Sequence, residues 1–464
     1  MKSYDLIVIG SGPGGYVAAV RAAHLGLKVA LVERDKRLGG TCLLRGCIPT
    51  KSLLHSADVL EEARHAQDSG IIVSDVRIDF SGVQKARERA VSKGAAGVEY
   101  LMKSNKVEVL RGHGSLVDAH TVAIKGAEGS DQVRTKFVLL ATGSAPRILA
   151  SLKPDGKHIL SSDQVLELKK MPESMMVLGA GAVGVEFASA YARFGAKMTV
   201  VEMQTTFLPN EDVEVGREFE RLFKKQGITC HTSTKLEKAE VQDGRVQISL
   251  AQGEKRWTES VEVLLVAVGR VPVTDSLGLE TVGIELDRGG YIPIDGLMRT
   301  RVPHIYAIGD VVPTPWLAHV ASAEAVLAVD HMAGREPQPL NYLQTPSCTY
   351  SEPEVGSVGL SEVAAKARGY NVKVGKFPFS AVGKARVMGR TDGFVKMVTD
   401  ARYGEILGVH IIGPRATDLI AVGCVAMRLE STAEDLAHTI TAHPTLAEGL
   451  LEAAHAAVDR PLHM

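Results

Sequence analysis

The chain has 464 residues, of which 45% are hydrophobic and 23% charged, a composition typical of globular proteins and far from that of disordered chains. At this length we expect three or four domains with room for a large cofactor. Its 53 basic and 54 acidic side chains give a net charge of -1. No basic field is available to attract nucleic acid or anionic lipid, so we expect neither as a partner.

The N-terminus favours a cytoplasmic protein, because Met1 leads into an apolar stretch at 6–9 without room for a signal peptide. No apolar run approaches the roughly 18 residues that a membrane span requires, so we expect no membrane association. The 5 cysteines are too few and too scattered for a disulfide-rich secreted scaffold.

Residues 4–33 predict a strand, a glycine-rich turn, a helix and a second strand. Gly10 permits the tight turn, Gly12 lets the backbone approach a pyrophosphate, and Gly15 allows close packing of the helix. Such a turn often only closes a strand–helix corner. The strand before it, the helix after it and Glu33 at the next strand end favour a dinucleotide site, in which Glu33 accepts the ribose hydroxyls.

The same pattern returns at residues 175–202, which predicts a second nucleotide site with glycines at Gly179, Gly181 and Gly184. Glu202 ends the second strand and would repel a 2′-phosphate, and the two residues after it are not basic. This pattern favours NAD over NADP, although an exposed acid after a simple turn would look similar.

Proline-containing stretches near 146–155 and 270–272 suggest domain boundaries. Beyond about residue 340, short β-like runs precede helical patterns at 417–430 and 445–458, which is typical of an α+β module. We therefore predict an α/β fold with two Rossmann-like dinucleotide-binding domains and a C-terminal α+β dimerisation domain. The predicted ranges are 1–148, 149–270, 271–341 (completing the first domain) and 342–464.

Cys42 and Cys47 are the only cysteines that are close neighbours in the sequence. Pro49 begins a helical pattern and therefore places Cys47 near a helix N-terminus, where a thiolate is stabilised. A zinc half-site or a pair of inert buried thiols are the alternatives. No second cysteine pair follows and the spacing is not CxxC, so we expect no metal.

Segments 39–51, 141–144, 307–310 and 442–448 occur in the order found in the pyridine nucleotide–disulphide oxidoreductases, which the sequence resembles over essentially its whole length. The resemblance implies FAD at the first site, NAD at the second, a redox-active Cys42–Cys47 disulfide and a homodimer. The fingerprints and the resemblance together assign to FAD the residues Gly10, Gly12, Gly14, Gly15, Glu33, Gly40, Thr41, Lys51, Thr142, Gly143, Ser144, Gly309, Asp310, Leu317, Ala318 and His319. They assign to NAD the residues Gly179, Gly181, Gly184, Glu186, Glu202 and Gly269.

The resemblance also implies that Lys51 pairs with Glu186 beside the flavin, and that the partner subunit supplies a base dyad of His443 and Glu448. From the residues alone, Lys51 would more often be a solvated charge and Glu186 a helix-surface acid. His443 would more often be a structural histidine. The following Pro444 suits a fixed turn, including one with a cis peptide bond.

Members of this family act on lipoyl groups, glutathione or mercuric ion, or transfer hydride between nucleotides. The acidic strand end at Glu202 disfavours a glutathione reductase, the lack of a C-terminal cysteine pair disfavours a mercuric reductase, and the intact Cys42–Cys47 pair disfavours a transhydrogenase. We expect oxidation of dihydrolipoyl groups carried by lipoyl domains of 2-oxo acid dehydrogenase or glycine-cleavage complexes. A non-catalytic FAD-binding scaffold is the alternative from another class, and the intact set of reactive residues argues against it.

By resemblance, His443 takes the substrate's proton, the substrate thiol attacks Cys42, and Cys47 leaves as a thiolate that passes electrons to FAD and then NAD. The spacing of the cysteines does not itself say which sulfur faces which partner. Arg45 departs from the family pattern. It lies beside the dithiol and either lowers a thiol pKa or points to solvent, and we favour the second interpretation.

Overall fold

The computed structural model describes residues 1–127 and 129–464. The chain forms two compact units, each assembled from separate stretches of sequence. The first comprises Met1–Ser52, Ser81–Arg147 and Arg270–Tyr342, and the second comprises Leu53–Phe80, Ile148–Gly269 and Leu343–Met464.

The first unit is built on a sheet with strand order β3-β2-β1-β6-β5-β4, to which β17 adds by pairing with β6. Its strands β1, β2, β3 and the second half of β6 run parallel, and β4 and β5 form an antiparallel arm. Residues 6–9 of β1 and 29–32 of β2 are apolar runs because both faces of these strands are buried there. The strands are β1 (Lys2–Ile9), β2 (Val29–Glu33), β3 (Glu108–Arg111), β4 (His113–Asp118), β5 (Thr121–Gly126), β6 (Gly129–Leu140) and β17 (Ile305–Ala307).

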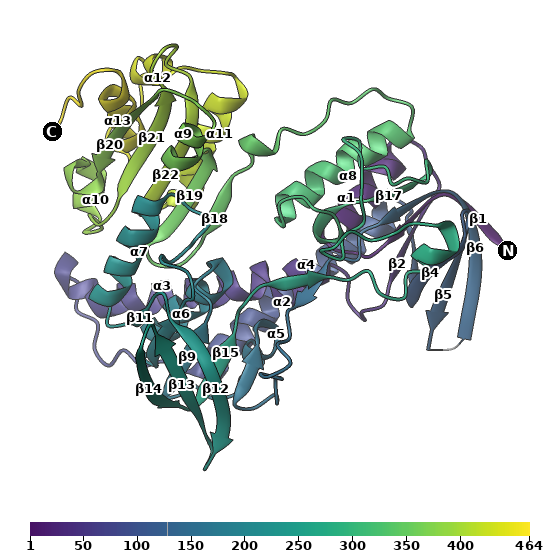
Figure 1. Ribbon diagram of the computed structural model, residues 1–464, viewed down its shortest axis with the longest axis horizontal. Helices are drawn as coiled ribbons and strands as arrows, with labels where there is room; N and C mark the ends of the chain where they lie inside the picture. Colours follow the sequence, from purple (N-terminus) through teal and green to yellow (C-terminus); the bar gives the residue numbers. More distant parts are fainter. Residues whose placement is uncertain (128) are drawn as a thin grey trace. The chain divides into compact units, whose positions relative to one another are not determined.

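Two helices, α1 (Pro13–His24) and α8 (Ala318–Met332), lie side by side on this sheet (Figure 1). They meet through small residues such as Ala18 and Ala22 of α1 and Ala325 of α8, all of them buried. Small side chains let two helix backbones approach closely. The residues after 270 therefore return to the first sheet through β17 and α8, although half of the chain separates them from β1.

The second unit contains a parallel sheet with strand order β11-β10-β9-β15-β8. Helix α6 (Ala182–Phe194) packs on β9 and β10. A three-stranded antiparallel sheet is inserted in the chain between β11 and β15. The parallel strands are β8 (Ile159–Ser161), β9 (Ser174–Leu178), β10 (Lys197–Val201), β11 (Thr229–His231) and β15 (Val263–Val266). The antiparallel strands are β12 (Lys235–Gln242), β13 (Arg245–Gln252) and β14 (Lys255–Val261), and helices α5 (Ser162–Val165) and α7 (Val213–Lys225) complete this part.

The C-terminal part of the second unit is an antiparallel sheet with strand order β18-β19-β22-β21-β20. Helices α11 and α13 lie against this sheet (Figure 1), and their buried residues form one apolar core with it. The strands are β18 (Ser347–Thr349), β19 (Glu354–Gly359), β20 (Val372–Pro378), β21 (Phe394–Asp400) and β22 (Ile406–Gly413). The helices are α9 (Glu362–Ala367), α10 (Gly383–Val387), α11 (Ala416–Arg428), α12 (Ala433–Ala437) and α13 (Glu448–Val458).

The predicted fold class is confirmed: two α/β parts with parallel sheets and a C-terminal α+β part are present. The helix predicted at 445–458 begins only at Glu448, because the residues before it form a turn that contains the cis peptide bond His443–Pro444. The four predicted domain ranges stay a proposal. None of the helices in the described part of the chain has both the length and the apolar character that crossing a bilayer demands.

Candidate active site

The first glycine-rich turn connects β1 to α1 and cannot accommodate side chains at two of its glycines. Gly10 has a φ of +106°, and a Cβ there would lie 2.3 Å from the carbonyl oxygen of Ala141. A Cβ on Gly15 would lie 1.8 Å from the carbonyl oxygen of Gly10. At Gly12, by contrast, no described atom lies within 4 Å of the Cβ position. The turn is therefore tightly packed on its inner side and open where the sequence predicts a pyrophosphate.

Glu33 ends β2 with its carboxylate turned toward the same turn. One carboxylate oxygen accepts hydrogen bonds from the Ser11 N–H at 2.9 Å and the Ser11 hydroxyl at 2.5 Å. The other accepts the Asp35 N–H at 2.8 Å. Glu33 thus lies next to the glycine-rich turn, in the place from which an acid reaches a ribose.

The second glycine-rich turn, between β9 and α6, repeats this geometry in the second unit. Gly179 also has a φ of +106°, and its Cβ would lie 2.4 Å from the carbonyl oxygen of Ala267. The Glu202 carboxylate at the end of β10 accepts the N–H groups of Ala180 and Gln204, each at 2.8 Å. Gly181 is open like Gly12. The predicted residue Gly184 packs against Gly179, and Gly269 follows β15 with a φ of +101°.

The ends of α1 and α6 fit nucleotide phosphates. Each helix begins after a glycine, with no side-chain cap and no acid in its first turn. Helix α7 shows the usual solution, since the Asp212 side chain caps its N-terminus. Unpaired N–H groups and the helix dipole favour an anion at such ends. Both sites therefore fit a dinucleotide.

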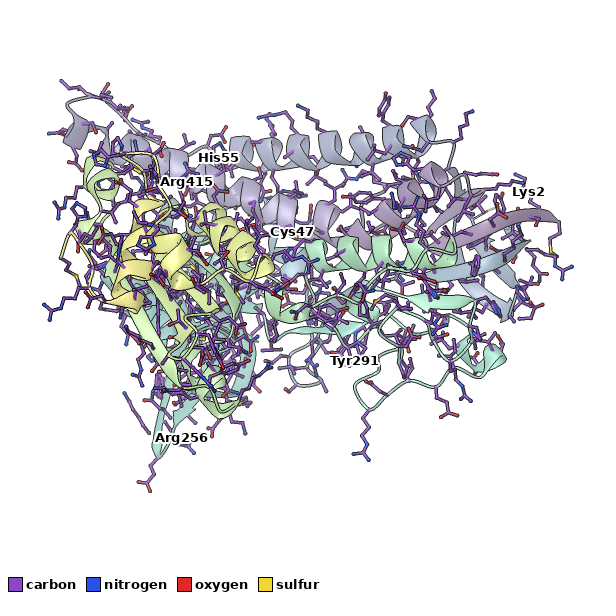
Figure 2. All side chains as sticks on the ribbon, turned by 90° about the horizontal axis from the view of Figure 1, so that it is seen from above. Lys2, Cys47, His55, Arg256, Tyr291 and Arg415 are labelled. Atoms are coloured by element: carbon purple, nitrogen blue, oxygen red, sulfur yellow. The ribbon has the colours of Figure 1, made fainter. Side chains whose placement is uncertain are left out.

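The two cysteines lie next to the first of these sites. Cys42 belongs to α2 (Gly40–Arg45) and Cys47 is the first residue of α3 (Cys47–His65), as Figure 2 shows for Cys47. Their sulfur atoms are 2.6 Å apart. A Cβ at Gly40 would lie 2.6 Å from the Cα of Gly12, so the cysteine segment packs directly on the glycine-rich turn. The structure thus places the dithiol and the predicted FAD site together.

The surroundings of Cys42 favour its protonated form. The hydrogen bond with Cys47 and burial raise the pKa of the Cys42 thiol, and the nearby charge of Lys51 acts in the opposite direction. Tyr16 lies close enough for Cys42 to contribute, after burial, to the rise of the tyrosine pKa. Cys47 lies at the start of α3, where a helix N-terminus stabilises a thiolate.

Arg45 does not follow the interpretation that we favoured from the sequence. Its guanidinium pairs with the Asp35 carboxylate, and both side chains are only partly exposed. The turn after β2 brings Asp35 to Arg45 of α2, and the pattern of residues gives no sign of this contact.

Asp310 lies in a short 3₁₀ turn, η3 (Gly309–Val311), in the first unit. Its carboxylate accepts a hydrogen bond of 2.5 Å from the Ser144 hydroxyl. Ser144 belongs to β7 (Ser144–Pro146), which pairs antiparallel with β16 (Arg270–Pro272). Burial raises the pKa of Asp310, and the Ser144 hydrogen bond and the charge of Arg270 oppose this rise.

The other predicted FAD residues cluster in the same unit. Thr142 donates its hydroxyl to the carbonyl oxygen of Val273 at 2.6 Å, and the Gly143 carbonyl accepts the Val273 N–H at 2.9 Å. The segment Leu317, Ala318 and His319 forms the N-terminus of α8. The remaining residues of this set are Gly14, which packs on α8, and Thr41 and Lys51, which lie in α2 and α3.

Glu186 is buried in α6 of the second unit, not on a helix surface, which contradicts the interpretation from residue type alone. One of its carboxylate oxygens accepts the Tyr350 N–H at 3.0 Å. Lys51 belongs to the first unit. The pairing of Lys51 with Glu186 stays a proposal.

His443 and Glu448 form a hydrogen-bonded dyad at the start of α13. The Nδ1 atom of His443 lies 2.7 Å from Glu448 Oε1, and Glu448 Oε2 accepts the Thr445 N–H at 2.9 Å. Burial opposes ionisation of Glu448, but these hydrogen bonds outweigh it and hold the pKa of the carboxyl below its usual range. The imidazole is 76% exposed, so within one subunit it is presented outward.

Sequence reasoning missed Arg270 and Glu324, two residues that contact the predicted FAD residues Ser144 and Gly309. Arg270 donates to the hydroxyl and the carbonyl oxygen of Ser144, at 2.7 Å each. Glu324 is completely buried in α8 and accepts the Gly309 N–H at 2.7 Å, which fixes the turn that carries Asp310. An acid between alanines in the middle of a largely apolar helix was the available signal for Glu324. Arg270 carried none beyond its place after Gly269.

The comparisons with known families match almost the whole chain. Residues 4–325 match the pyridine nucleotide-disulphide oxidoreductase family, and residues 345–454 match the dimerisation domain of the same family. The chain therefore belongs to the pyridine nucleotide-disulphide oxidoreductases. It is an oxidoreductase and a flavoprotein that uses FAD and NAD, and its dimerisation domain supports a homodimer.

Individual relatives cover the full length. The chain is 45% identical to the dihydrolipoyl dehydrogenase of Bacillus subtilis, covering 99% of both chains, and 46% identical to that of Chlorobaculum tepidum, covering 97% of this chain and 96% of the relative. Among solved structures, LpdA from Mycobacterium tuberculosis superposes with a TM-score of 0.91 at 30% identity, over 97% of this chain and 99% of that one. The flavoprotein disulfide reductase RclA from Escherichia coli gives a TM-score of 0.88 at 26% identity, over 98% of this chain and 99% of that one.

Proposed function

We propose that this chain is a dihydrolipoyl dehydrogenase, which oxidises a dihydrolipoyl group to a cyclic disulfide and reduces NAD+ to NADH. The observation that carries the proposal is the Cys42–Cys47 pair, with its sulfurs 2.6 Å apart and packed against the first glycine-rich turn. Full-length relatives at 45% and 46% identity bear this name.

The cysteines exchange a disulfide with the substrate. A substrate thiolate attacks Cys42 Sγ, a mixed disulfide forms, and the bond between the two cysteine sulfurs breaks. Cys47 receives the electron pair as a thiolate, which the N-terminus of α3 stabilises. The second substrate thiol then attacks the mixed disulfide, releases the oxidised substrate and leaves the cysteine pair reduced.

His443, supplied by the partner subunit in the proposed dimer, takes the substrate's proton. Glu448 on Nδ1 fixes the tautomer of the ring, so the basic nitrogen is Nε2. The lowered pKa of Glu448 keeps it ionised and able to stabilise the imidazolium that forms.

The two glycine-rich turns hold the nucleotides. The first turn, Glu33 and Asp310 would hold FAD, and the second turn and Glu202 would hold NAD. When bound, FAD supplies two-electron acceptance from the dithiol and hydride donation to NAD+. The carboxylate of Glu202 favours NAD, because it pairs with ribose hydroxyls and repels a 2′-phosphate.

We further propose that the substrate is presented on lipoyl domains of 2-oxo acid dehydrogenase or glycine-cleavage complexes, and that the protein is cytoplasmic. A lipoyl group tethered to a mobile domain can reach a site at a subunit interface. Some relatives are named as mitochondrial, such as that of Schizosaccharomyces pombe.

A steady-state comparison of substrates tests the proposal. The purified FAD-bound protein is assayed with dihydrolipoamide and NAD+ or NADP+, and with oxidised glutathione or mercuric ion and NADH or NADPH. We expect turnover with dihydrolipoamide and NAD+ to exceed every other combination by at least about 10²-fold, since a site built for one polar partner rejects others strongly. Preferred turnover of glutathione or mercuric ion would replace the proposal with another disulfide reductase. No turnover with any substrate would favour a scaffold.

A further inference from the structure

The first unit contains a chain of polar contacts that starts at Arg270. This residue opens β16, which pairs antiparallel with β7, so that Arg270 lies opposite Pro146 and Pro272 opposite Ser144. The guanidinium reaches along the pair, and its Nε atom lies 2.7 Å from the Ser144 hydroxyl oxygen. A second guanidinium nitrogen donates to the Ser144 carbonyl oxygen at 2.7 Å. Two N–H groups of the rigid guanidinium therefore donate hydrogen bonds to one serine.

These hydrogen bonds determine the direction of the Ser144 hydroxyl proton. The hydroxyl oxygen accepts the Arg270 N–H, so its own proton is available to a further acceptor. That acceptor is Asp310 Oδ2 at 2.5 Å. Arg270, Ser144 and Asp310 thus form a chain of hydrogen bonds in which Ser144 links the guanidinium to the Asp310 carboxylate.

A second buried carboxylate, that of Glu324, interacts with the charge of Asp310. Glu324 on α8 is fully buried and accepts the Gly309 N–H at 2.7 Å and the Tyr342 hydroxyl at 2.9 Å. Burial raises the pKa of Glu324, and the neighbouring charge of Asp310 adds to the rise. Like charges in a poorly solvated site disfavour each other's ionisation. Arg270 is the cation that compensates Asp310.

We propose that Arg270 is a positioning residue for the flavin: acting through Ser144, it keeps the Asp310 carboxylate ionised and aimed at the ribityl hydroxyls. The inference rests on the proposed function, because the contact of Asp310 with FAD belongs to that proposal. An ionised carboxylate can accept hydrogen bonds from two hydroxyls through its two oxygens. In a protonated carboxyl group, one of these oxygens carries the proton and acts as a donor. Flavin affinity should therefore follow the charge of Asp310.

The alternative is that Arg270 only stabilises the pairing of β16 with β7. In that case R270M would weaken FAD binding by the same factor whether or not Asp310 is replaced. A residue that acts through Asp310 loses its effect on FAD once Asp310 cannot ionise. A double-mutant cycle separates the two, since coupling appears only between residues that act on each other.

The test measures FAD binding to the flavin-free full-length protein by quenching of flavin fluorescence, at several pH values between about 5 and about 9. We compare R270M, R270K and S144A with wild type, and R301M serves as a control that removes an exposed positive charge from the same unit. At neutral pH we expect R270M and S144A to weaken FAD binding by about tenfold or more, as for a charge-assisted hydrogen bond. The FAD affinity of R270K should lie between that of these variants and that of wild type, because lysine keeps the charge but cannot make both hydrogen bonds to Ser144.

The pH dependence of FAD binding shows in which direction Arg270 changes the ionisation of Asp310. FAD binding to wild type weakens as the pH falls and Asp310 takes up a proton, and in R270M this weakening should begin at higher pH, because the opposing cation is gone. In a D310N background, R270M should have no further effect. Wild-type affinity and pH profile in S144A and R270K, or an undiminished effect of R270M with D310N, would overturn the inference. Failure of the wild-type protein to bind FAD at all would instead overturn the proposed function.

Discussion

The Nδ1 atom of His443 lies 2.7 Å from Glu448 Oε1, and this contact fixes which nitrogen of the ring is basic. Two residues of one short segment therefore form a complete acid–base unit in each subunit. The cis peptide bond His443–Pro444 belongs to the turn that carries the dyad.

Replacement of His443 by Gln should lower kcat/KM for dihydrolipoamide by roughly 10²- to 10⁴-fold, the usual contribution of a positioned base. Oxidation of NADH by an artificial dye does not require the base and should change little, which makes it the internal control. His438→Gln, a substitution at an exposed histidine five positions before His443, is the matched control variant. Equal losses in both activities would mean that the substitution damages the fold and not the base.

Mixed dimers test whether the site is shared between subunits. Cys42→Ser and His443→Gln proteins should each be inactive with dihydrolipoamide. Unfolding and refolding them together should restore roughly a quarter of wild-type activity, because half of the dimers are mixed and each mixed dimer has one intact site. Activity that stays at the level of the separate proteins, with mixed dimers verified by two affinity tags, would place the base in the same subunit as its cysteines.

Glu202 sets the nucleotide preference in this account. Glu202→Ala should lower kcat/KM for NAD+ by about 10- to 100-fold, corresponding to about 1.5–3 kcal/mol for a hydrogen bond to a charged group. The value for NADP+ should stay the same or rise, because the repulsion of the 2′-phosphate is removed. Met203→Ala, at a neighbouring side chain that is 68% exposed, should leave both values unchanged. A parallel loss for the two nucleotides would show that Glu202 only supports the turn.

The buried Lys396 should be the most sensitive charged position in the C-terminal sheet. Its ammonium group pairs with Asp212 at 3.0 Å and with Glu214 and Glu362 at 2.8 Å. Lys396→Met leaves the buried carboxylate of Asp212 without its ammonium partner and should destabilise the protein by about 3–5 kcal/mol. Lys366→Met removes an exposed partner of Glu362 and should cost at most about 1 kcal/mol.

The same cluster predicts a pH dependence. Lys366 and Lys396 hold the pKa of Glu362 below its usual range. A carboxyl whose pKa is lowered by folding stabilises the protein above its unfolded pKa of about 4.3, and this contribution is lost as the pH falls further. Urea unfolding of the FAD-bound protein between about pH 3.5 and about pH 7 measures both effects. Lys396→Met with wild-type stability, or with the full wild-type loss in acid, would contradict this description.

Features that depend on a short stretch of sequence could be predicted. Gly10 and Glu33 belong to one strand–turn–helix–strand unit, and both lie where the pattern places them. The cysteines are five positions apart and were recognised as a pair, which the 2.6 Å between their sulfurs confirms.

Contacts between distant segments could not be predicted. Arg270 and Ser144 are 126 positions apart, and Ser144 and Asp310 are 166 apart. The pairing of β7 with β16 brings Ser144 and Arg270 together, and Asp310 follows β17, which returns to the first sheet by pairing with β6. Lys396 is a similar case, because a lysine in a strand predicts an exposed side chain, and its partner Asp212 comes from 184 positions away. Arg45 was misjudged over only ten positions, since its pairing with Asp35 depends on the path of a turn.

The most direct test of the central claim is an anaerobic titration of the FAD-bound protein with dihydrolipoamide, followed by its absorption spectrum, in wild type, Cys42→Ser and Cys47→Ser. A thiolate beside the oxidised flavin gives a long-wavelength absorption band. We predict that the band appears in wild type upon addition of about one dihydrolipoamide per FAD, is present in Cys42→Ser without substrate, and is absent in Cys47→Ser. Reduction of the flavin by dihydrolipoamide in Cys47→Ser, at the wild-type rate, would contradict the claim that electrons pass through this cysteine pair.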